Sequence, residues 1–468
     1  MSHRIPGWTL AVSALAIFMV SLDNLVVTNA LTSIREDLGA SLEALEWTVN
    51  GYTLAFAVFL LTGAALGDRF GRRRTFLAGL AIFTGASAAA ALAPSTGALI
   101  AARAVQGLGA AILAPLSLTL LSTAAPAERR GLALGVWSGI SGLAVALGPL
   151  VGGAVIEGMS WQWIFWVNVP VGLVLAPLAA SRLEESHGPS ARLDLTGLAL
   201  ASAGLLGVVL GVVRGNPAGW GSTEVVVSIA AGAALLVAFV AWELRARAPM
   251  LPMRLFRSRQ FAATNGVSLA MTFGIFGSIF LLAQFFQTVQ GYSPLEAGLR
   301  TLPWTGMPMF VAPVAGILSD RLGSRPLMSA GLFMQAIAIA WIALVSEPDT
   351  AYGVLVPAFV LGGAGMALVF APAANAVLGA VRPEEAGQAS GANNAIRELG
   401  GVLGVAVLAA VFTGAGGFET PQAFVDGLVP AMWVGAAVLV AGGLAALLIP
   451  GKRRAAAVAP ALPEPVAA

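Results

Sequence analysis

The sequence predicts an all-helical membrane protein with fourteen transmembrane helices, arranged as six, two and six, with both termini in the cytoplasm. Composition is the first observation behind this prediction. Of the 468 residues, 58% are hydrophobic and only 10% are charged, whereas about 25% of the residues of a soluble globular protein are charged. Apolar segments of about 20 residues recur along the whole chain, and each is long enough to cross a hydrocarbon core about 30 Å thick.

The apolar segments give the approximate position of each span. In chain order they lie near residues 8–33, 46–66, 75–94, 97–122, 131–156, 162–181, 194–213, 224–244, 261–289, 300–318, 326–345, 353–380, 390–414 and 428–449. The connections are short except for 182–193 and 245–260. An even number of spans places both termini on the same side of the membrane.

The positions of Lys and Arg predict which side that is. With the N-terminus in the cytoplasm, 20 of the 25 basic residues fall on the cytoplasmic side. Only Arg35, Arg214 and Arg300 fall outside, and Arg103 and Arg397 lie within spans. Cytoplasmic loops of membrane proteins carry an excess of Lys and Arg. One missed or extra span would disturb this asymmetry over the rest of the chain.

Several classes of protein are excluded by what the sequence lacks. There is no Cys, and the two histidines, His3 and His187, lie in polar segments. We therefore expect no disulfide, no thiolate chemistry and no bound metal. The glycine-rich runs lie inside spans, so none of them is a phosphate-binding loop. These features argue against an enzyme and against an ATP-driven pump on this chain. The sequence also contains no loop that resembles a selectivity filter, which argues against a channel.

A charged turn occurs twice between apolar segments. Residues 67–74 read GDRFGRRR and residues 319–326 read SDRLGSRP, so that Asp68 and Asp320 are 252 residues apart. If two helices with their linkers are inserted between two copies of a repeat, the remaining period is about 190 residues, which suits six spans with short loops. Parallel repeats with a substrate site between them describe one class of secondary transporter.

This repeat predicts four regions. They are a six-helix bundle over residues 1–182, two additional helices with linkers over 183–258, a second six-helix bundle over 259–450 and a cytoplasmic tail over 451–468.

Several motifs occur in order at these spans. The charged turns lie in AALGDRFGRR (64–73) and GILSDRLGSR (316–325), and the other motifs are LDNLVVTNAL (22–31), AARAVQGLGAAILAP (101–115), GLAVALGPLVGG (142–153) and WQWIFWVNVPVG (161–172). With these motifs the chain resembles the major facilitator superfamily, specifically its fourteen-span drug–proton antiporters. The resemblance covers almost the whole chain and implies the major facilitator fold. The first-helix motif departs most from the family pattern, at Leu25 and Thr28.

The resemblance also implies an activity. We expect proton-coupled efflux of drugs, antibiotics or other amphipathic small molecules across the cytoplasmic membrane by alternating access. The expected ligands are a small molecule and H⁺, with the proton motive force in place of a cofactor. We further expect a monomer in the lipid bilayer with no nucleic-acid partner. The alternatives are export of a native metabolite, peptide or lipid-like compound on the same scaffold, and a proton-coupled importer.

The charged turns are candidates for a latch between the two halves. A carboxylate can accept backbone N–H bonds at a helix N-terminus, where the helix dipole favours an anion. The repeat predicts that Asp68 meets the start of the thirteenth span near Gly387–Ala392, and that Asp320 meets the start of the fifth near Gly131. The proposed latch residues are Asp68, Arg69, Gly71, Arg72, Asp320 and Arg321. The alternative is that the turns serve only as topology signals, although orientation alone needs no acid.

The fifth span carries the gating candidates Gly148, Pro149 and Gly152. Small residues let helix backbones approach closely, and proline removes an internal hydrogen bond and bends the helix. The spacing around Gly148 and Pro149 matches the antiporter motif. It indicates a pliable contact between the halves, where tight packing alone is the alternative.

Charged residues inside spans are candidates for proton coupling, because burying them in a membrane is costly. Asp23 and Arg103 lie at similar depth and could pair, and Arg397 and Glu398 lie together in the thirteenth span. A carboxylate in a cavity can bind a proton from one side of the membrane and release it to the other. For the two arginines, structural pairing is an equally good interpretation.

The remaining polar groups at plausible cavity depth are candidates for substrate binding. They are Asn50, Tyr52, Gln106, Gln284, Gln287, Asn393 and Asn394. Hydrogen bonding between helices is an equally good interpretation of each.

Overall fold

The computed structural model describes residues 7–125, 130–187, 194–381 and 386–451, and these residues form helices joined by short loops, with no β-strand among them. The first group consists of α1 (Gly7–Leu38), α2 (Leu42–Phe70), α3 (Arg72–Ala91), α4 (Thr96–Ala124), α5 (Arg130–Gly158), α6 (Trp163–Trp166) and α7 (Asn168–Arg182). A pair follows, α8 (Leu195–Ala218) and α9 (Thr223–Glu243). The last group consists of η2 (Met253–Arg257), α10 (Arg259–Gln284), η3 (Phe285–Val289), α11 (Pro294–Thr305), α12 (Met307–Leu322), α13 (Ser324–Val345), α14 (Tyr352–Leu378), α15 (Ala386–Ala415) and α16 (Pro421–Ala446).

Side-chain caps begin many of these helices. A hydroxyl or carboxylate just before the helix accepts one of the first backbone N–H groups, which have no partner within the helix. Ser41 caps α2, Ser95 caps α4 and Asp194 caps α8 in this way. At α11, Ser293 and Glu296 form a reciprocal capping box. The caps explain why helices follow such short loops.

The predicted number of spans is close to what the structure shows. Twelve described segments are long and apolar enough to cross a membrane. The second span, α2, passes the same test as two parts bent by 49° at Leu61. The 29-residue helix α5 lies where the fifth span is expected, but much of its first half falls outside the residues whose side chains are described. The chain is therefore an all-helical, multi-pass membrane protein.

Two expected spans are broken helices. The sixth is divided into α6 and α7, and the tenth into α11 and α12 at Gly306. Pro308 lies in the first turn of α12. Its missing backbone N–H is tolerated there, because the first N–H groups of a helix have no partner within the helix. The proline ring, however, prevents α11 from continuing into α12 as one regular helix. The ninth span ends in a turn of π-helix, η3.

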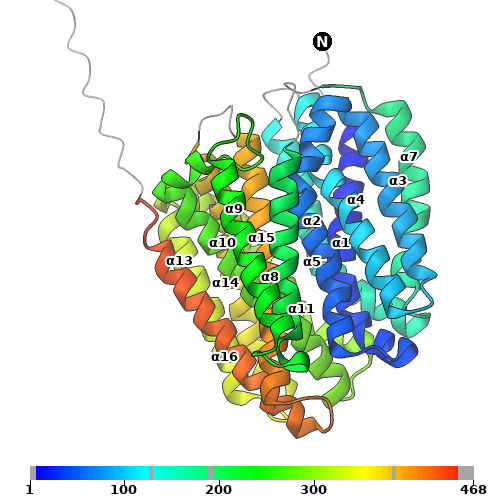
Figure 1. Cartoon of the computed structure of the whole chain (residues 1–468), viewed down its shortest axis with the longest axis vertical. Coiled ribbons are helices and arrows are strands. Elements are labelled where there is room, and N and C mark those ends of the chain that lie inside the picture. The colour runs from blue at the N-terminus through cyan, green and yellow to red at the C-terminus, as the bar shows by residue number, and fades with distance from the viewer. Residues whose placement is uncertain (1–6, 126–129, 188–193, 382–385, 452–468) are drawn as a thin grey trace, which may run out of the picture.

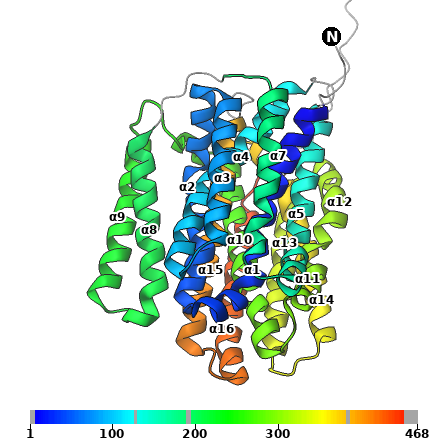
Figure 2. The same ribbon diagram turned by 90° about the vertical axis from the view of Figure 1, so that its right-hand side faces the viewer.

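The start of α1 and the last turn of α16 both lie toward the upper end of the molecule in Figure 1. Following the charge asymmetry, we call this the cytoplasmic end and the opposite end the outer end. Seen from the side, α8 and α9 stand as a pair beside the other helices (Figure 2). Leu54 and Val58 of α2, Val209 and Val213 of α8, and Val402 and Ala406 of α15 share one apolar cluster. The pair therefore packs along the line where α2 meets α15.

The repeat is visible in the backbone of the two charged turns. Gly71 and Gly323, which are 252 residues apart like the aspartates, both have positive φ, at 103° and 84°. Each lies at the junction of two consecutive helices, α2–α3 and α12–α13. A residue with a Cβ rarely adopts this conformation. The sharp helix–helix turn therefore explains why both copies of the motif contain this glycine.

Candidate functional site

The centre of the first group contains a buried ion pair. Arg103 of α4 donates a 2.5 Å hydrogen bond from Nη1 to Oδ2 of Asp23 on α1. Both side chains are almost completely buried, at 1% exposure. The expected pairing of these two residues at one depth is therefore present. A buried pair is stable only where further hydrogen bonds satisfy both partners.

Those further bonds are present around Asp23. Gln106 of α4 and Asn168 of α7 each donate a 2.8 Å hydrogen bond to Oδ1 of Asp23. Gln106 also donates to Ser87 Oγ of α3 at 2.8 Å. Three helices, α1, α4 and α7, thus meet at one carboxylate, and α3 joins the network through Gln106. Three donors reach it, so its acceptor capacity is nearly filled.

Arg103 is fixed as firmly as its partner. Its Nε donates to the backbone carbonyl of Thr48 at 3.2 Å, and Nη1 also donates to Gln106 Oε1 at 2.7 Å. The guanidinium lies over the Tyr52 ring, 4.2 Å from its centroid, a geometry that attracts a cation. The Tyr52 hydroxyl in turn donates to the carbonyl of Val20. Arg103 therefore joins α1, α2 and α4.

The sequence analysis did not single out Asn168 and Ser87. Asn168 lies in the quoted motif WQWIFWVNVPVG, so the signal was present, but its amide belonged to no group of candidates. Ser87 lies in an Ala-rich stretch of α3 and carries no sequence signal. Only the packing of α7 against α1 brings Asn168 to Asp23, and only the packing of α3 against α4 and α7 brings Ser87 to Gln106 and Asn168.

The polar candidates of α15 form a second, separate cluster in the last group. Arg397 donates to Asn394 Oδ1 at 3.1 Å and lies 4.7 Å from the centroid of the Phe370 ring. Glu398 is the next residue along α15, and its Oε2 is buried without a hydrogen-bond partner. Asn393 donates to Asn265 and Ser268 of α10 at 3.0 and 2.9 Å, which is hydrogen bonding between helices.

The other predicted substrate-binding residues have different surroundings. Gln284 donates to the carbonyl of Phe280 in its own helix. Gln287 donates to the carbonyl of Asn29 at 3.1 Å and so joins the last group to the first. Asn50 is fully buried, and neither of its amide atoms has a hydrogen-bond partner.

The first charged turn is tied to its own group. Asp68 pairs with Arg72 one turn later at 2.8 Å. The N-terminus of α3 receives a carboxylate, but it is that of Glu185, which accepts from the backbone N–H groups of Arg73 and Arg74. Arg69 is exposed, and so is Arg321 in the second turn. The Asp320 side chain and the residues around Gly131 and Gly387 lie outside the side chains that the structure describes, so the latch stays a prediction.

The glycines of α5 lie at close helix contacts. A Cβ on Gly152 would lie 2.7 Å from the carbonyl oxygen of Val26 on α1. A Cβ on the next residue, Gly153, would lie 2.4 Å from the carbonyl oxygen of Pro294 on α11. Gly148 is buried, whereas the Pro149 ring lies outside the described side chains. The motif therefore ends where the first group touches the last.

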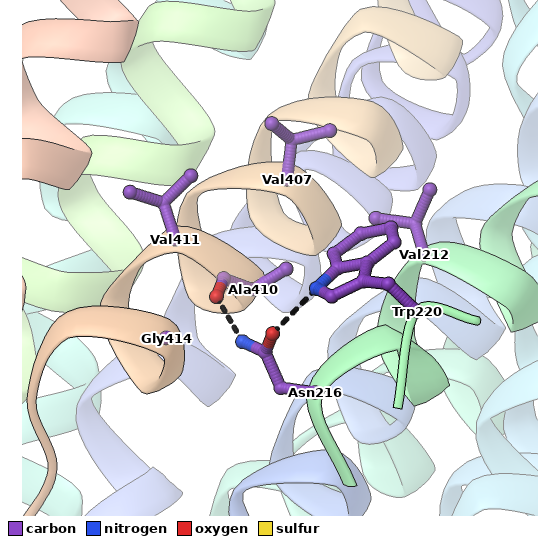
Figure 3. A pocket seen from close by; sticks show the side chains of 7 residues that line it. All are labelled: Val212, Asn216, Trp220, Val407, Ala410, Val411 and Gly414. Carbon is purple, nitrogen blue, oxygen red and sulfur yellow. Dashed lines mark hydrogen bonds between the residues drawn. The ribbon is translucent and has the colours of Figure 1, made fainter. Parts of the chain in front are cut away.

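Two surface grooves lie apart from these polar clusters. One, of about 300 Å³, lies between α8 and α15 (Figure 3) and is lined by Val212, Asn216, Trp220, Val407, Ala410, Val411 and Gly414. Asn216 is already engaged there with the Ala410 carbonyl and with Trp220. The other, of about 470 Å³, is lined by Val155 of α5, by Trp163 and Trp166 of α6, and by Val169 and Pro170 of α7, with Met159 and Val167. Among the described residues no group of three His, Asp or Glu side chains is placed to hold a metal ion.

Comparison with known families matches this helical arrangement to one model, the Major Facilitator Superfamily, over residues 13–405. The chain belongs to the Major Facilitator Superfamily. The resemblance inferred from the motifs is thereby confirmed. Members of this superfamily transport small molecules and are not enzymes, and this chain is a multi-pass protein of the cell membrane.

Several superfamily relatives are similar over most of this chain. The tetracenomycin C resistance and export protein of Streptomyces glaucescens is 35% identical over 427 residues, covering 91% of this chain and 79% of that protein. The cephamycin export protein of Amycolatopsis lactamdurans is 42% identical, with 88% and 86% covered. The puromycin resistance protein of Streptomyces alboniger is 36% identical, with 96% and 92% covered.

Solved structures of the superfamily share the fold. The peptide-transporter-family protein PepTSo aligns with a TM-score of 0.70 at 14% identity and covers 95% of this chain and 98% of its own. A D-xylose–proton symporter aligns with a TM-score of 0.64 at 15% identity, with 94% and 97% covered. At such low identity the likeness supports the major facilitator fold alone.

Proposed function

We propose that this protein exports an antibiotic or another amphipathic small molecule across the cell membrane in exchange for protons, as a monomer working by alternating access. The observation that carries the proposal is the similarity to resistance and export proteins over most of the chain. The buried Asp23–Arg103 pair supports the proton-coupled part, because ionisable groups inside spans mark proton and substrate pathways.

In the proposed cycle Asp23 carries the proton. Protonation removes the charge that holds the Arg103 guanidinium at 2.5 Å. Arg103 then keeps only its bonds to the Thr48 carbonyl and to Gln106. Because these bonds join α1, α2 and α4, a change at one carboxylate is transmitted to the packing of three helices. Glu398 and Arg397 on α15 are the proposed counterpart in the other half.

The energy available is sufficient for such exchange. One charge moving through about 150 mV releases roughly 3.5 kcal/mol. Since about 1.4 kcal/mol corresponds to a factor of ten, one proton per cycle would sustain a substrate gradient of a few hundredfold.

Expression in an efflux-deficient bacterium exposed to a panel of antibiotics and dyes tests the export. We expect raised resistance that a protonophore abolishes. In vesicles of purified protein, an imposed pH step should drive movement of the same compound. Transport that ignores both the pH step and an imposed voltage would rule out proton exchange.

Export of a native metabolite is the second candidate on the same scaffold. It is favoured by relatives whose names denote export of a bacterial product, such as the cephamycin export protein. Growth of the source strain with the gene deleted, followed by comparison of intracellular and extracellular metabolites, distinguishes the two. A compound that accumulates inside the deletion strain would favour the native exporter.

A further inference from the structure

Glu46 of α2 is a buried carboxylate that the proposed mechanism does not use. Its side chain is only 3% exposed, and Oε2 has no hydrogen-bond partner. One turn further along the helix, Asn50 is fully buried with both amide atoms unpartnered. Nearly all buried polar groups in proteins are hydrogen-bonded. Two unpartnered groups at adjacent turns of one face therefore call for a functional explanation.

The neighbours of α2 show where this face points. Gly51 and Tyr52 pack against α4, since a Cβ on Gly51 would touch Ile100 and Tyr52 contacts Gly107. Leu45 and Val49 belong to a core cluster that also contains α1 residues, whereas Leu54 and Val58 share a cluster with α8 and α15. At about 100° per residue, Glu46 and Asn50 lie between the α1 side and the α15 side. They occupy the seam between the first and last groups.

This seam is closed at the outer end. Gln287 of η3 donates to the Asn29 carbonyl of α1, Ser293 donates to Glu157 of α5 at 3.1 Å, and Gly153 packs against Pro294. Glu46 lies in the first turns of α2, which begins at the outer end. The carboxylate is thus buried near the end of the molecule at which these contacts join the two groups.

No described cation is placed to neutralise Glu46. Glu43, one turn earlier, is partly exposed and pairs with Arg214 of α8. Arg103 of α4 is bound to Asp23 of α1 on the Tyr52 flank of α2. On α15, Arg397 is held by Asn394, and its neighbour Glu398 has no described partner at Oε2. An ionised carboxylate buried without a partner is strongly disfavoured and takes up a proton instead.

We propose that Glu46 is a second proton-binding site, distinct from Asp23, which is protonated when the outer seam closes and ionises when the seam opens to water. Proton uptake from the outside then accompanies closure at the outer end. Asn50 is the next polar group inward along the same face and would meet a proton or hydrated cation after Glu46. The link to gating rests on the proposed alternating access, whereas the protonation of Glu46 in the closed form does not.

Infrared spectroscopy of the full-length protein in lipid nanodiscs, without substrate, tests the protonation. A buried carboxylic acid has a C=O absorption distinct from that of a carboxylate. We expect part of this absorption near neutral pH to be lost in Glu46→Gln and retained in Glu43→Gln, Asp23→Asn and Glu398→Gln, because Glu398 also carries a buried oxygen without a partner. If Glu46→Gln is too unstable to study, Glu46→Asp should shift the band. An unchanged spectrum in the Glu46 variants would overturn the proposal.

The gating is tested by distance measurement. The chain has no Cys, so spin labels can be placed on Ser160→Cys and Ala351→Cys, both exposed near the outer end. We expect the distance to widen as pH rises, and this response to be lost in Glu46→Gln but not in Glu43→Gln. A wild-type distance independent of pH, or an unaltered response in Glu46→Gln, would contradict the proposal. Failure of export with the band and the response intact would count against the proposed function only.

Discussion

Asn168 of α7 donates a 2.8 Å hydrogen bond to Asp23 of α1, and both side chains are buried. Through this bond the sixth span contributes to the same carboxylate as the fourth. The site is thus a junction of helices in which the donors to Asp23 come from two elements, α4 and α7. Removing one donor at a time is the direct way to learn which element responds to the charge on Asp23.

The first prediction concerns Asp23 itself. In Asp23→Asn the side chain keeps its size but cannot carry a proton, so we expect proton-driven export to be lost while the protein still reaches the membrane. Resistance of an efflux-deficient host and protein level in isolated membranes are the two measurements. Asp37→Asn, an exposed acid on the same helix, is the control. Normal proton-dependent efflux by Asp23→Asn would remove Asp23 from the coupling role.

The second prediction concerns Asn168. Asn168→Ala leaves Asp23 with fewer donors, and a lost buried hydrogen bond to a charged group destabilises by about 1.5–3 kcal/mol. We expect a lower unfolding temperature and a shifted pH dependence of transport. Asn216→Ala, which also removes a bonded amide but at the distant α8–α15 contact, should lower stability without moving the pH profile. Equal pH profiles for the two variants would make Asn168 purely structural.

Gly153 gives a prediction about the outer seam. A Cβ there would lie 2.4 Å from the Pro294 carbonyl oxygen, which forces α5 and α11 apart. We expect Gly153→Ala to favour the form open to the outside, seen as faster labelling of an Asn29→Cys reporter by a membrane-impermeant thiol reagent. Gly158→Ala at the end of the same helix, where a Cβ has open space, serves as the control. Labelling at the same rate in both variants would show that this contact does not hold the seam closed.

The last prediction concerns the charged turn. If Asp68 acts as a latch, Asp68→Asn should slow the transport cycle several-fold while substrate affinity stays the same. Its visible partner is Arg72, so a merely local role predicts reduced stability with normal turnover. Transport rate and substrate binding are measured separately, with exposed Glu184→Gln in a nearby loop as the control. An unchanged rate would leave the turn as a topology signal.

Much of the fold followed from the chain alone, because the membrane imposes strong rules on sequence. Apolar segments must span the bilayer, and basic residues stay in the cytoplasm. Gly71 and Gly323 both have positive φ, so the sharp turn in each copy of the motif depends on a glycine that can be read from the sequence. The cost of burying charge likewise singled out Asp23 and Arg103, which the structure joins.

Only the tertiary structure decided which polar groups meet. Asn168 reaches Asp23 because α7 packs on α1, and Ser87 reaches Gln106 because α3 packs on α4. No periodicity in the sequence encodes these contacts. Glu46, near the start of its helix, resembles an ordinary exposed acid in the sequence. In the folded chain it is buried and its Oε2 has no hydrogen-bond partner. The hydropathy of a span depends only on residues of that one segment, whereas the hydrogen-bond partners of a buried side chain come from helices far apart in the chain.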